Sequence, residues 1–211
     1  MKNKGLFITL SGCDGVGKTS TGQLAVKKLI NEGYDAIFLD MYYSSFSKML
    51  RKAIMDHKNL SHETEAFTFT AIFQNLWDSY IRKYVNNGMI VIMDRWSEDT
   101  FVYDHLTFNT VSKPKAIIDP EVDRLAILID MDPKVALKRI ADNEQREVNK
   151  FDKMDVKIHK AIRENFLTTW GKCNKVKPKE YKTISVMNKS LEEVTEEVIG
   201  LIISRYKEVN Q

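Results

Sequence analysis

Near its N-terminus the chain reads Gly12-Cys13-Asp14-Gly15-Val16-Gly17-Lys18-Thr19, which matches the pattern G-x-x-x-x-G-K-[ST] without a gap. Residues 6–10 before it are apolar and have the length of a buried strand, and apolar residues at helical spacing follow within residues 20–30. A strand, a glycine loop and a helix in this order predict a phosphate-binding loop, in which backbone N–H groups and the helix dipole face phosphate oxygens. We assign this loop, up to and including Ser20, to the phosphates of a nucleotide. Lys18 is the expected partner of the β- and γ-phosphates, and the Thr19 hydroxyl is the expected Mg²⁺ ligand.

Length and composition restrict the class of protein. The 211 residues, 43% of them hydrophobic, are enough for one domain with a complete core, which we place over residues 1–211. The net charge of +3 creates no field that favours nucleic acid or an anionic membrane as a partner, and no apolar run approaches the ~18 residues of a membrane helix. Cys13 and Cys173 have neither metal-site nor disulfide-framework spacing, and no signal peptide precedes the first strand, so we expect a cytoplasmic protein.

Five strand-like runs alternate with helical patterns, at residues 5–11, 35–40, 88–93, 125–131 and 181–186. The third and fourth runs are apolar without alternation, which is typical of strands that helices cover on both faces. This order predicts an α/β phosphate-loop kinase fold with a five-stranded parallel sheet wrapped by helices. Because parallel strands end at one edge, we expect the motifs after Ser11, Asp40, Met93 and Asp130 to lie near one another.

A second polar cluster, Asp94-Arg95, directly follows the third strand. A carboxylate that ends a strand beside a phosphate loop orders Mg²⁺, and a neighbouring arginine clamps a phosphate with two hydrogen bonds. A surface ion pair is the plainer interpretation, but a charge directly after five apolar residues is poorly placed for it. Asp130 is a second candidate for the metal, which we rank lower because Asp132-Pro133 follows and predicts a helix cap.

A third polar segment, about residues 140–150, joins two predicted helices and contains Arg146 and Lys150, with Arg139 just before it. One interpretation is a solvated loop. The other is a short lid whose arginines close over the transferring phosphoryl group and keep water away from it.

Three motifs, spread over nearly the whole chain, resemble those of thymidylate kinases within the nucleoside monophosphate kinases. The first is the acid in the phosphate loop, here Asp14. The second is Asp-Arg-aromatic followed by a Ser or Thr and an aromatic residue, here Asp94-Arg95-Trp96 with Thr100 and Tyr103. The third is a strand, Asp, Pro and then Ala-Leu-x-Arg, here residues 129–133 and 136–139. This resemblance favours the lid interpretation of the third polar segment.

The resemblance implies transfer of the γ-phosphoryl group of ATP, with Mg²⁺, to a deoxypyrimidine monophosphate, foremost dTMP to give dTDP. By the same resemblance Asp14 contacts the deoxyribose 3′-hydroxyl or the acceptor phosphate region, Arg95 holds the acceptor phosphate, and Tyr103 lies near the sugar. Thr100 belongs to the same acceptor site, and Phe69 or Phe73 stacks on the base.

The resemblance also bears on the catalytic arginine and on assembly. Gly15 stands where one branch of the family has an arginine, so the catalytic arginine is expected from the lid, Arg146 first and Arg139 next. A homodimer is expected through the outward face of the helix 62–87, which carries four large apolar residues: Phe67, Leu76, Trp77 and Tyr80.

Two departures from the family pattern leave the acceptor open. After the second strand the chain reads Asp40-Met41-Tyr42-Tyr43 and has no arginine until Arg51, where the family usually grips the acceptor phosphate. On the long helix Gln74 stands near the usual arginine, and its amide can both donate to and accept from a pyrimidine edge. Both features also resemble deoxynucleoside kinases, in which the acid, here Asp40, would take the proton of a 5′-hydroxyl. A regulatory phosphate-loop NTPase is a further alternative, although the polar segment suits a lid better.

Overall fold

The computed structural model describes residues 3–57, 59–104, 122–142 and 155–211. Its five strands form one parallel sheet in the order β2-β3-β1-β4-β5. The strands are β1 (Leu6–Ser11), β2 (Ala36–Leu39), β3 (Ile90–Asp94), β4 (Arg124–Asp130) and β5 (Tyr181–Ser185). The structure therefore confirms the predicted α/β sheet, with strand ends shifted by one or two residues.

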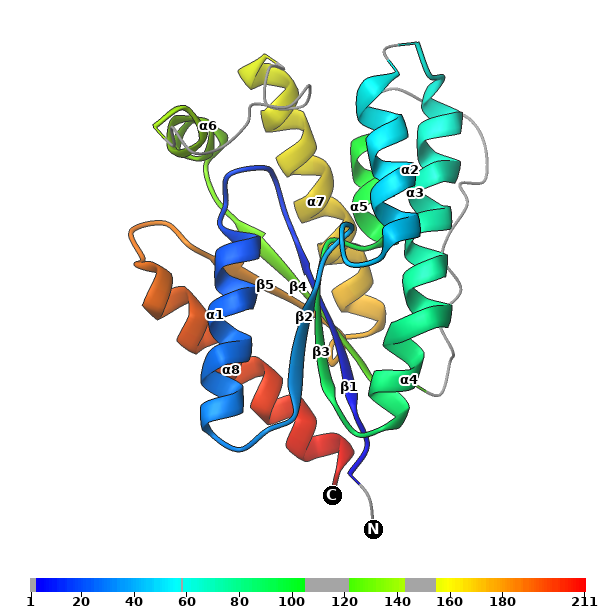
Figure 1. Cartoon of the computed structure of the whole chain (residues 1–211). Coiled ribbons are helices and arrows are strands. Elements are labelled where there is room, and N and C mark those ends of the chain that lie inside the picture. The colour runs from blue at the N-terminus through cyan, green and yellow to red at the C-terminus, as the bar shows by residue number, and fades with distance from the viewer. Residues whose placement is uncertain (1–2, 58, 105–121, 143–154) are drawn as a thin grey trace.

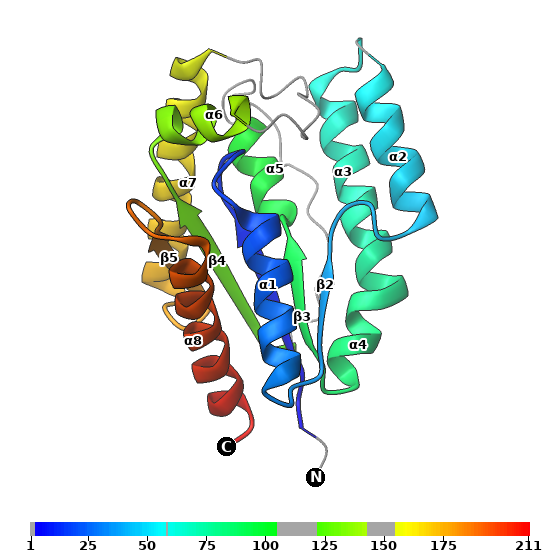
Figure 2. The same ribbon diagram turned by 60° about the vertical axis from the view of Figure 1, so that its left-hand side comes forward.

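Helices cover both faces of the sheet. Figures 1 and 2 show α1 (Lys18–Asn31) and α8 (Leu191–Val209) packed side by side on one face. The opposite face carries α3 (His62–Leu76), α4 (Arg82–Asn86), α5 (Ser97–Asp104) and α7 (Val156–Val176). The remaining helices, α2 (Ser45–Asp56) and α6 (Pro133–Ala141), lie on either side of the phosphate-binding loop at the top of Figure 1.

Local sequence signals explain where these helices begin and end. The Asp132 carboxylate accepts a hydrogen bond from Lys134 N at the start of α6, and Ser190 and Glu193 form a capping box at the start of α8, as the sequence predicts. Gly33 after α1 and Gly88 after α4 have φ values of 88° and 91°, a left-handed conformation that glycine adopts without strain. No helix in the described ranges combines the length and apolar character needed to cross a membrane.

The long helix predicted from His62 to residue 87 is present, but it is not uniform. Between α3 and α4 the chain widens into a π-helical turn, Trp77–Ile81. Leu76 and Trp77 are 0% and 2% exposed, and the Trp77 ring packs against Phe7 of β1. These two residues therefore belong to the core and not to the outward face, which corrects the expectation that they form part of a dimer surface.

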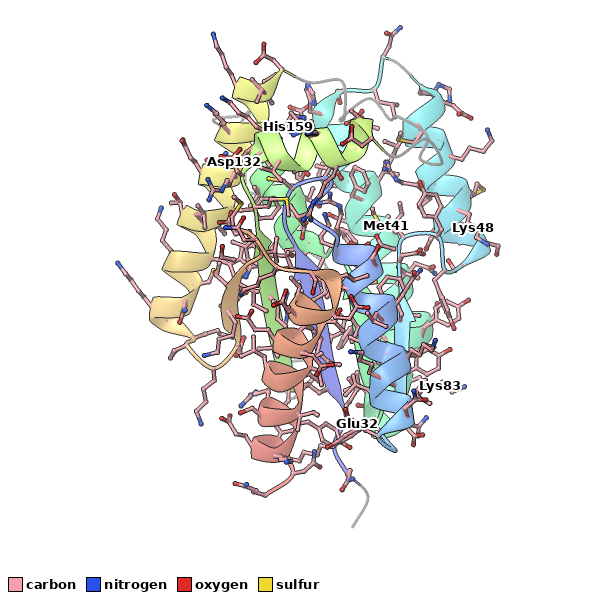
Figure 3. All side chains as sticks on the ribbon, turned by 90° about the vertical axis from the view of Figure 1, so that its left-hand side faces the viewer. Glu32, Met41, Lys48, Lys83, Asp132 and His159 are labelled. Carbon is pink, nitrogen blue, oxygen red and sulfur yellow. The ribbon has the colours of Figure 1, made fainter. Side chains whose placement is uncertain are left out.

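The carboxyl ends of the strands share one edge of the sheet. In Figure 3, Met41 and Asp132, which follow β2 and β4, lie toward the upper end of the molecule. Glu32 and Lys83, which precede β2 and β3, lie at the opposite end. The polar residues that follow β1 and β3 accordingly meet at the upper edge.

Candidate active site

A cavity of about 430 Å³ opens at this edge. Its walls are the phosphate-binding loop and the start of α1, the end of β3, and the last turn of α6. The lining residues are Asp14, Gly15, Gly17, Lys18, Thr19, Ser20, Asp94, Arg95, Arg139 and Ile140. Three cations and two carboxylates thus face one space, a composition suited to a polyphosphate and a divalent metal ion.

Glycines let the loop adopt its shape and let α6 rest on it. Gly12 and Gly15 have φ values of 141° and 81°. A Cβ atom on Gly12 would lie 2.4 Å from the carbonyl oxygen of Ile129, and one on Gly15 would lie 2.5 Å from that of Ala136. Because Ala136 belongs to α6, this close approach places the exposed Arg139, one turn later, at the cavity. A side chain at position 15 would therefore force α6 away from the loop.

Lys18 is held by the loop's own carbonyl groups. Its Nζ donates hydrogen bonds to the carbonyl oxygens of Gly12 at 3.1 Å and Cys13 at 2.7 Å. Burial, and next the neighbouring Arg95 charge, lower the pKa of Lys18 from its ordinary value. Phosphate oxygens would supply the negative charge that this buried ammonium group lacks.

Cys13 contributes to the loop through its backbone. Its side chain is 4% exposed and belongs to the apolar core, while its carbonyl oxygen faces Lys18. Burial raises the pKa of the thiol to about 11. The Val16 side chain, 3% exposed, is likewise part of the core, so both residues are expected to meet a nucleotide only through backbone groups.

Thr19 and Asp94 form a pair suited to a metal ion. The Thr19 hydroxyl donates a 2.5 Å hydrogen bond to Oδ2 of Asp94. The other oxygen, Oδ1, is buried and accepts no hydrogen bond from any described residue. A hydroxyl and a carboxylate beside phosphates are the ligand set that Mg²⁺ takes in phosphoryl-transfer sites, with water and phosphate oxygens completing its shell. The residues present therefore fit Mg²⁺.

Arg95 occupies the centre of the polar cluster in a left-handed backbone conformation, with φ 67°, which is uncommon for a residue with a side chain. Its Nη2 donates to Oδ1 of Asp14 at 2.6 Å and to the Tyr103 hydroxyl at 3.3 Å. Its Nη1 donates to Oδ1 of Asp99 at 2.8 Å and to the carbonyl oxygen of Gly12 at 3.2 Å. The structure thus brings three predicted site residues, Asp14, Arg95 and Tyr103, into direct contact.

The three residues predicted around the acceptor base differ in exposure. Phe73 is 1% exposed and packs against Trp96 with ring centroids 5.0 Å apart, so it is a core residue and not a stacking surface. Phe69 is half-buried, with the Arg51 guanidinium 5.3 Å from its ring centroid. Gln74 is half-buried and donates a hydrogen bond from Nε2 to Asp78 at 3.1 Å.

The other predicted residues are placed as follows. Thr100 is buried in α5. Asp40 accepts a hydrogen bond from the backbone N–H of Tyr42 at 2.8 Å, which makes it a turn residue in this structure. Asp130 pairs with Arg163 of α7 through two hydrogen bonds of 2.7 and 2.8 Å. Arg146, Lys150 and most of the expected lid lie outside the described residues.

Two residues of this region were not predicted from the sequence. Asp99 stands four residues after Arg95, and this spacing of opposite charges at a helix start is a signal that would have found it. Arg51 is 8% exposed on α2, and its Nε is buried with no hydrogen-bond partner in the described ranges. The sequence offered one signal for Arg51. It lies on the buried face of α2, whereas the lysines of that helix are exposed.

The sequence profile of the thymidylate kinase family matches residues 10–198. The chain belongs to the thymidylate kinase family. Thymidylate kinase of Clostridium novyi (strain NT) is 29% identical over 208 residues, covering 95% of this chain and 99% of that protein. The probable thymidylate kinase of Thermococcus gammatolerans is 27% identical, covering 94% and 96%. A solved thymidylate kinase structure from Candida albicans superimposes with a TM-score of 0.72 at 14% identity, covering 99% and 94%, and so shares the fold.

Membership of this family decides the class of reaction. The chain is an ATP-dependent nucleoside monophosphate kinase, and the reaction of the family is the phosphorylation of dTMP to dTDP. The deoxynucleoside kinase and the regulatory NTPase, which the sequence left open, are therefore set aside.

Proposed function

We propose that this chain transfers the γ-phosphoryl group of ATP to dTMP in the cavity between the phosphate-binding loop, Arg95 and α6. One observation carries the proposal: the cation expected at the donor and the cation expected at the acceptor touch the same atom. Lys18 Nζ and Arg95 Nη1 lie 3.1 and 3.2 Å from the carbonyl oxygen of Gly12. Phosphates held by these two cations would be neighbours, which is the arrangement that direct transfer requires.

On the donor side, the loop binds the ATP phosphates through backbone N–H groups, and Lys18 follows the β- and γ-phosphates. Its carbonyl partners are weak compared with phosphate oxygens, so ATP competes successfully for the ammonium group. The exposed guanidinium of Arg139 lines the same cavity and meets charge that develops on the transferring group.

On the acceptor side, Arg95 binds the dTMP phosphate through the guanidinium edge that contacts Asp14 in this structure. Asp14 then turns to the sugar. In this structure its Oδ2 accepts a hydrogen bond from the Tyr103 hydroxyl at 3.3 Å, so Tyr103 lies beside it. The acceptor oxygen is already anionic, so transfer needs no general base, and catalysis consists of positioning and charge neutralisation. Asp40, which accepts a bond from its own turn, has no catalytic role in this scheme.

We also propose that Mg²⁺ is held by Thr19 and Asp94 together with the nucleotide. Bound there, the ion would supply charge neutralisation for the β- and γ-phosphates. Buried Oδ1 of Asp94, which has no hydrogen bond from the described residues, is the atom that supports this assignment.

Three further features stay predictions. Arg146 and the lid at about 140–150 lie outside the described residues, and we propose that Arg146 completes the charge cluster when both substrates are bound. We propose a homodimer through α3, where Phe67 is 61% exposed; Leu76 and Trp77 are buried and do not belong to this surface. A cytoplasmic location remains an expectation from the two free cysteines.

The acceptor role of Arg95 is tested by Arg95→Ala with Arg163→Ala as control. Both changes remove an arginine bound to a carboxylate, but Arg163 is outside the cavity lining. Loss of a charge-assisted, two-bond phosphate contact should raise the KM for dTMP about 30- to 100-fold, while the KM for ATP changes far less. An equal rise in both KM values, or the same change in Arg163→Ala, would contradict the assignment.

A further inference from the structure

Asp99, in the first turn of α5, connects the end of β1 to Arg95. Its side chain is 5% exposed, and both of its oxygens accept hydrogen bonds. Oδ1 accepts from Nη1 of Arg95 at 2.8 Å. Oδ2 accepts from the Ser11 hydroxyl at 2.6 Å and from the backbone N–H of Trp96 at 3.3 Å. Because Ser11 immediately precedes the phosphate-binding loop, one carboxylate joins the loop's base to the arginine of the acceptor side.

We propose that Asp99 is a positioning residue, which holds the Arg95 guanidinium against the phosphate-binding loop so that the acceptor phosphate binds next to the γ-phosphate of ATP. The inference rests on the proposed function, because that function makes Arg95 the partner of the acceptor phosphate. Asp99 itself touches neither substrate in this account.

The two carboxylates around Arg95 are not equivalent. Asp14 lines the cavity and contacts Nη2, so an incoming phosphate meets Asp14 directly and competes with it for that edge of the guanidinium. Asp99 is not among the residues that line the cavity, and it contacts Nη1, the nitrogen that also bonds to the Gly12 carbonyl oxygen. The Nη1 edge therefore stays fixed by Asp99 and the loop while the Nη2 edge exchanges Asp14 for phosphate.

The backbone of Arg95 is fixed, but its long side chain needs a second fixed point to hold the guanidinium in place. Arg95 is in a left-handed conformation directly after β3, and its main-chain N–H bonds to the Leu10 carbonyl oxygen at 2.9 Å. A long arginine side chain starting from this point has several rotatable bonds, and without a fixed partner it would lose orientation as well as binding strength. Buried ion pairs add little net stability compared with apolar packing, so stability alone is a weak reason for this one.

Burial acts against the charge on Asp99. Desolvation raises the pKa of this carboxyl from its ordinary value, and the Arg95 charge and the Ser11 hydroxyl lower it. Asp99 and Arg95 thus support each other's charged forms. Among the described residues, removing the Asp99 carboxylate leaves Asp14, which the substrate must displace, as the carboxylate that hydrogen-bonds to Arg95.

The neighbouring residue provides a matched control. Glu98 is in the same helical turn, its side chain is 7% exposed, and it also pairs with an arginine, Arg124, at 2.6 Å. It accepts a further bond from the Tyr181 hydroxyl at 3.2 Å, and none of these partners lies in the cavity. Glu98→Gln and Asp99→Asn therefore make the same chemical change, from carboxylate to amide, at two buried ion pairs of one helix. The two side chains differ in length by one methylene group.

The experiment compares initial rates of dTDP formation by wild type, Asp99→Asn and Glu98→Gln, with dTMP and Mg-ATP varied separately. We expect Asp99→Asn to raise the KM for dTMP about 10-fold, with the KM for ATP within about twofold, since a charge-assisted bond becomes a neutral one. Glu98→Gln should lower the melting temperature without changing the ratio of the two KM values. An unchanged KM for dTMP in Asp99→Asn, or an equal rise in Glu98→Gln, would overturn the inference.

A second variant covers the case in which Asp99→Asn does not fold. Ser11→Ala removes only the hydroxyl that anchors Oδ2 of Asp99, and we expect a smaller rise in the KM for dTMP, about threefold, in the same direction. A Ser11→Ala enzyme with wild-type KM values would count against the inference. Failure of the wild-type enzyme to phosphorylate dTMP would instead refute the proposed function, so the two outcomes are separable.

Discussion

The contact between Gly15 and α6 gives a prediction whose size follows from the structure. Gly15→Ala requires a side chain at φ 81°, which costs about 1–2 kcal/mol by itself. The new Cβ would also lie 2.5 Å from the Ala136 carbonyl oxygen and 2.9 Å from Cγ1 of Ile140, so α6 must move by almost an ångström. Overpacking of this kind adds about 1–3 kcal/mol, for a total loss of about 2–5 kcal/mol in the free energy of unfolding.

Gly33→Ala is the matched control. Gly33 has φ 88°, nearly the same strain, but a Cβ there would meet no atom within 4 Å. It should therefore lose only the conformational part, about 1–2 kcal/mol, and keep wild-type kinetics. In Gly15→Ala the shift of α6 also displaces Arg139, and a displacement of about 1 Å near a reacting group lowers kcat roughly 10²-fold.

Urea unfolding and initial rates of phosphoryl transfer measure both effects. We expect Gly15→Ala to be less stable than Gly33→Ala by about 1–3 kcal/mol and to turn over far more slowly. If the two variants unfold with equal free energies and Gly15→Ala keeps its kcat, α6 does not rest on the loop at this position, and the reasoning fails.

Three other predictions can be checked with the same assays. Lys18→Ala should lower kcat by about 10²-fold or more in a protein that still folds, because the ammonium group supplies charge to phosphate; full turnover in this variant would be incompatible with the loop assignment. Arg146→Ala should lower kcat by roughly 10³-fold with little change in the KM for ATP, as expected of a group that meets charge in the transition state; a higher KM with constant kcat would shift that role to Arg139. Because burial raises the pKa of Cys13 to about 11 from 9.0, the unfolded chain ionises first, and stability should fall as pH rises from 9 to 11. Cys13→Ala should abolish that part of the loss, about 2 kcal/mol at pH 10.5 in urea unfolding.

The fold was largely predictable because its signals are local and repeated. Each strand is a short apolar run, and the caps of α6 and α8 follow from Asp132 and Ser190 within four residues of sequence. Parallel pairing then brought the ends of β1 and β3 together without any knowledge of side-chain positions. The phosphate-binding loop and Asp94-Arg95 were found by the same reasoning.

The features that the sequence did not reveal depend on the orientation of individual side chains and on contacts between residues far apart in the chain. The π-helical turn at Trp77–Ile81 changes the facing of the residues that follow it, which a count at 3.6 residues per turn does not anticipate. Leu76 and Trp77 come before this change, three and four residues after the buried Phe73, so helical spacing was enough to place them in the core. Phe69 and Phe73 are four residues apart and looked equivalent, but Phe73 is fully buried against Trp96 while Phe69 is half-buried. The link from Ser11 to Asp99 joins residues 88 positions apart, and no local pattern predicts such a contact.

In the proposed reaction the γ-phosphoryl group passes from ATP to a nucleoside monophosphate. The two phosphates are held side by side by Lys18 and Arg95, which both contact the Gly12 carbonyl oxygen. The most direct test measures ADP and product formation with Mg-ATP in three parallel reactions, containing dTMP, thymidine or no acceptor. We expect ADP and dTDP to appear in equal amounts with dTMP, and we expect the reactions with thymidine or without acceptor to consume little ATP. Faster phosphorylation of thymidine than of dTMP, or ATP hydrolysis that is independent of any acceptor, would contradict it.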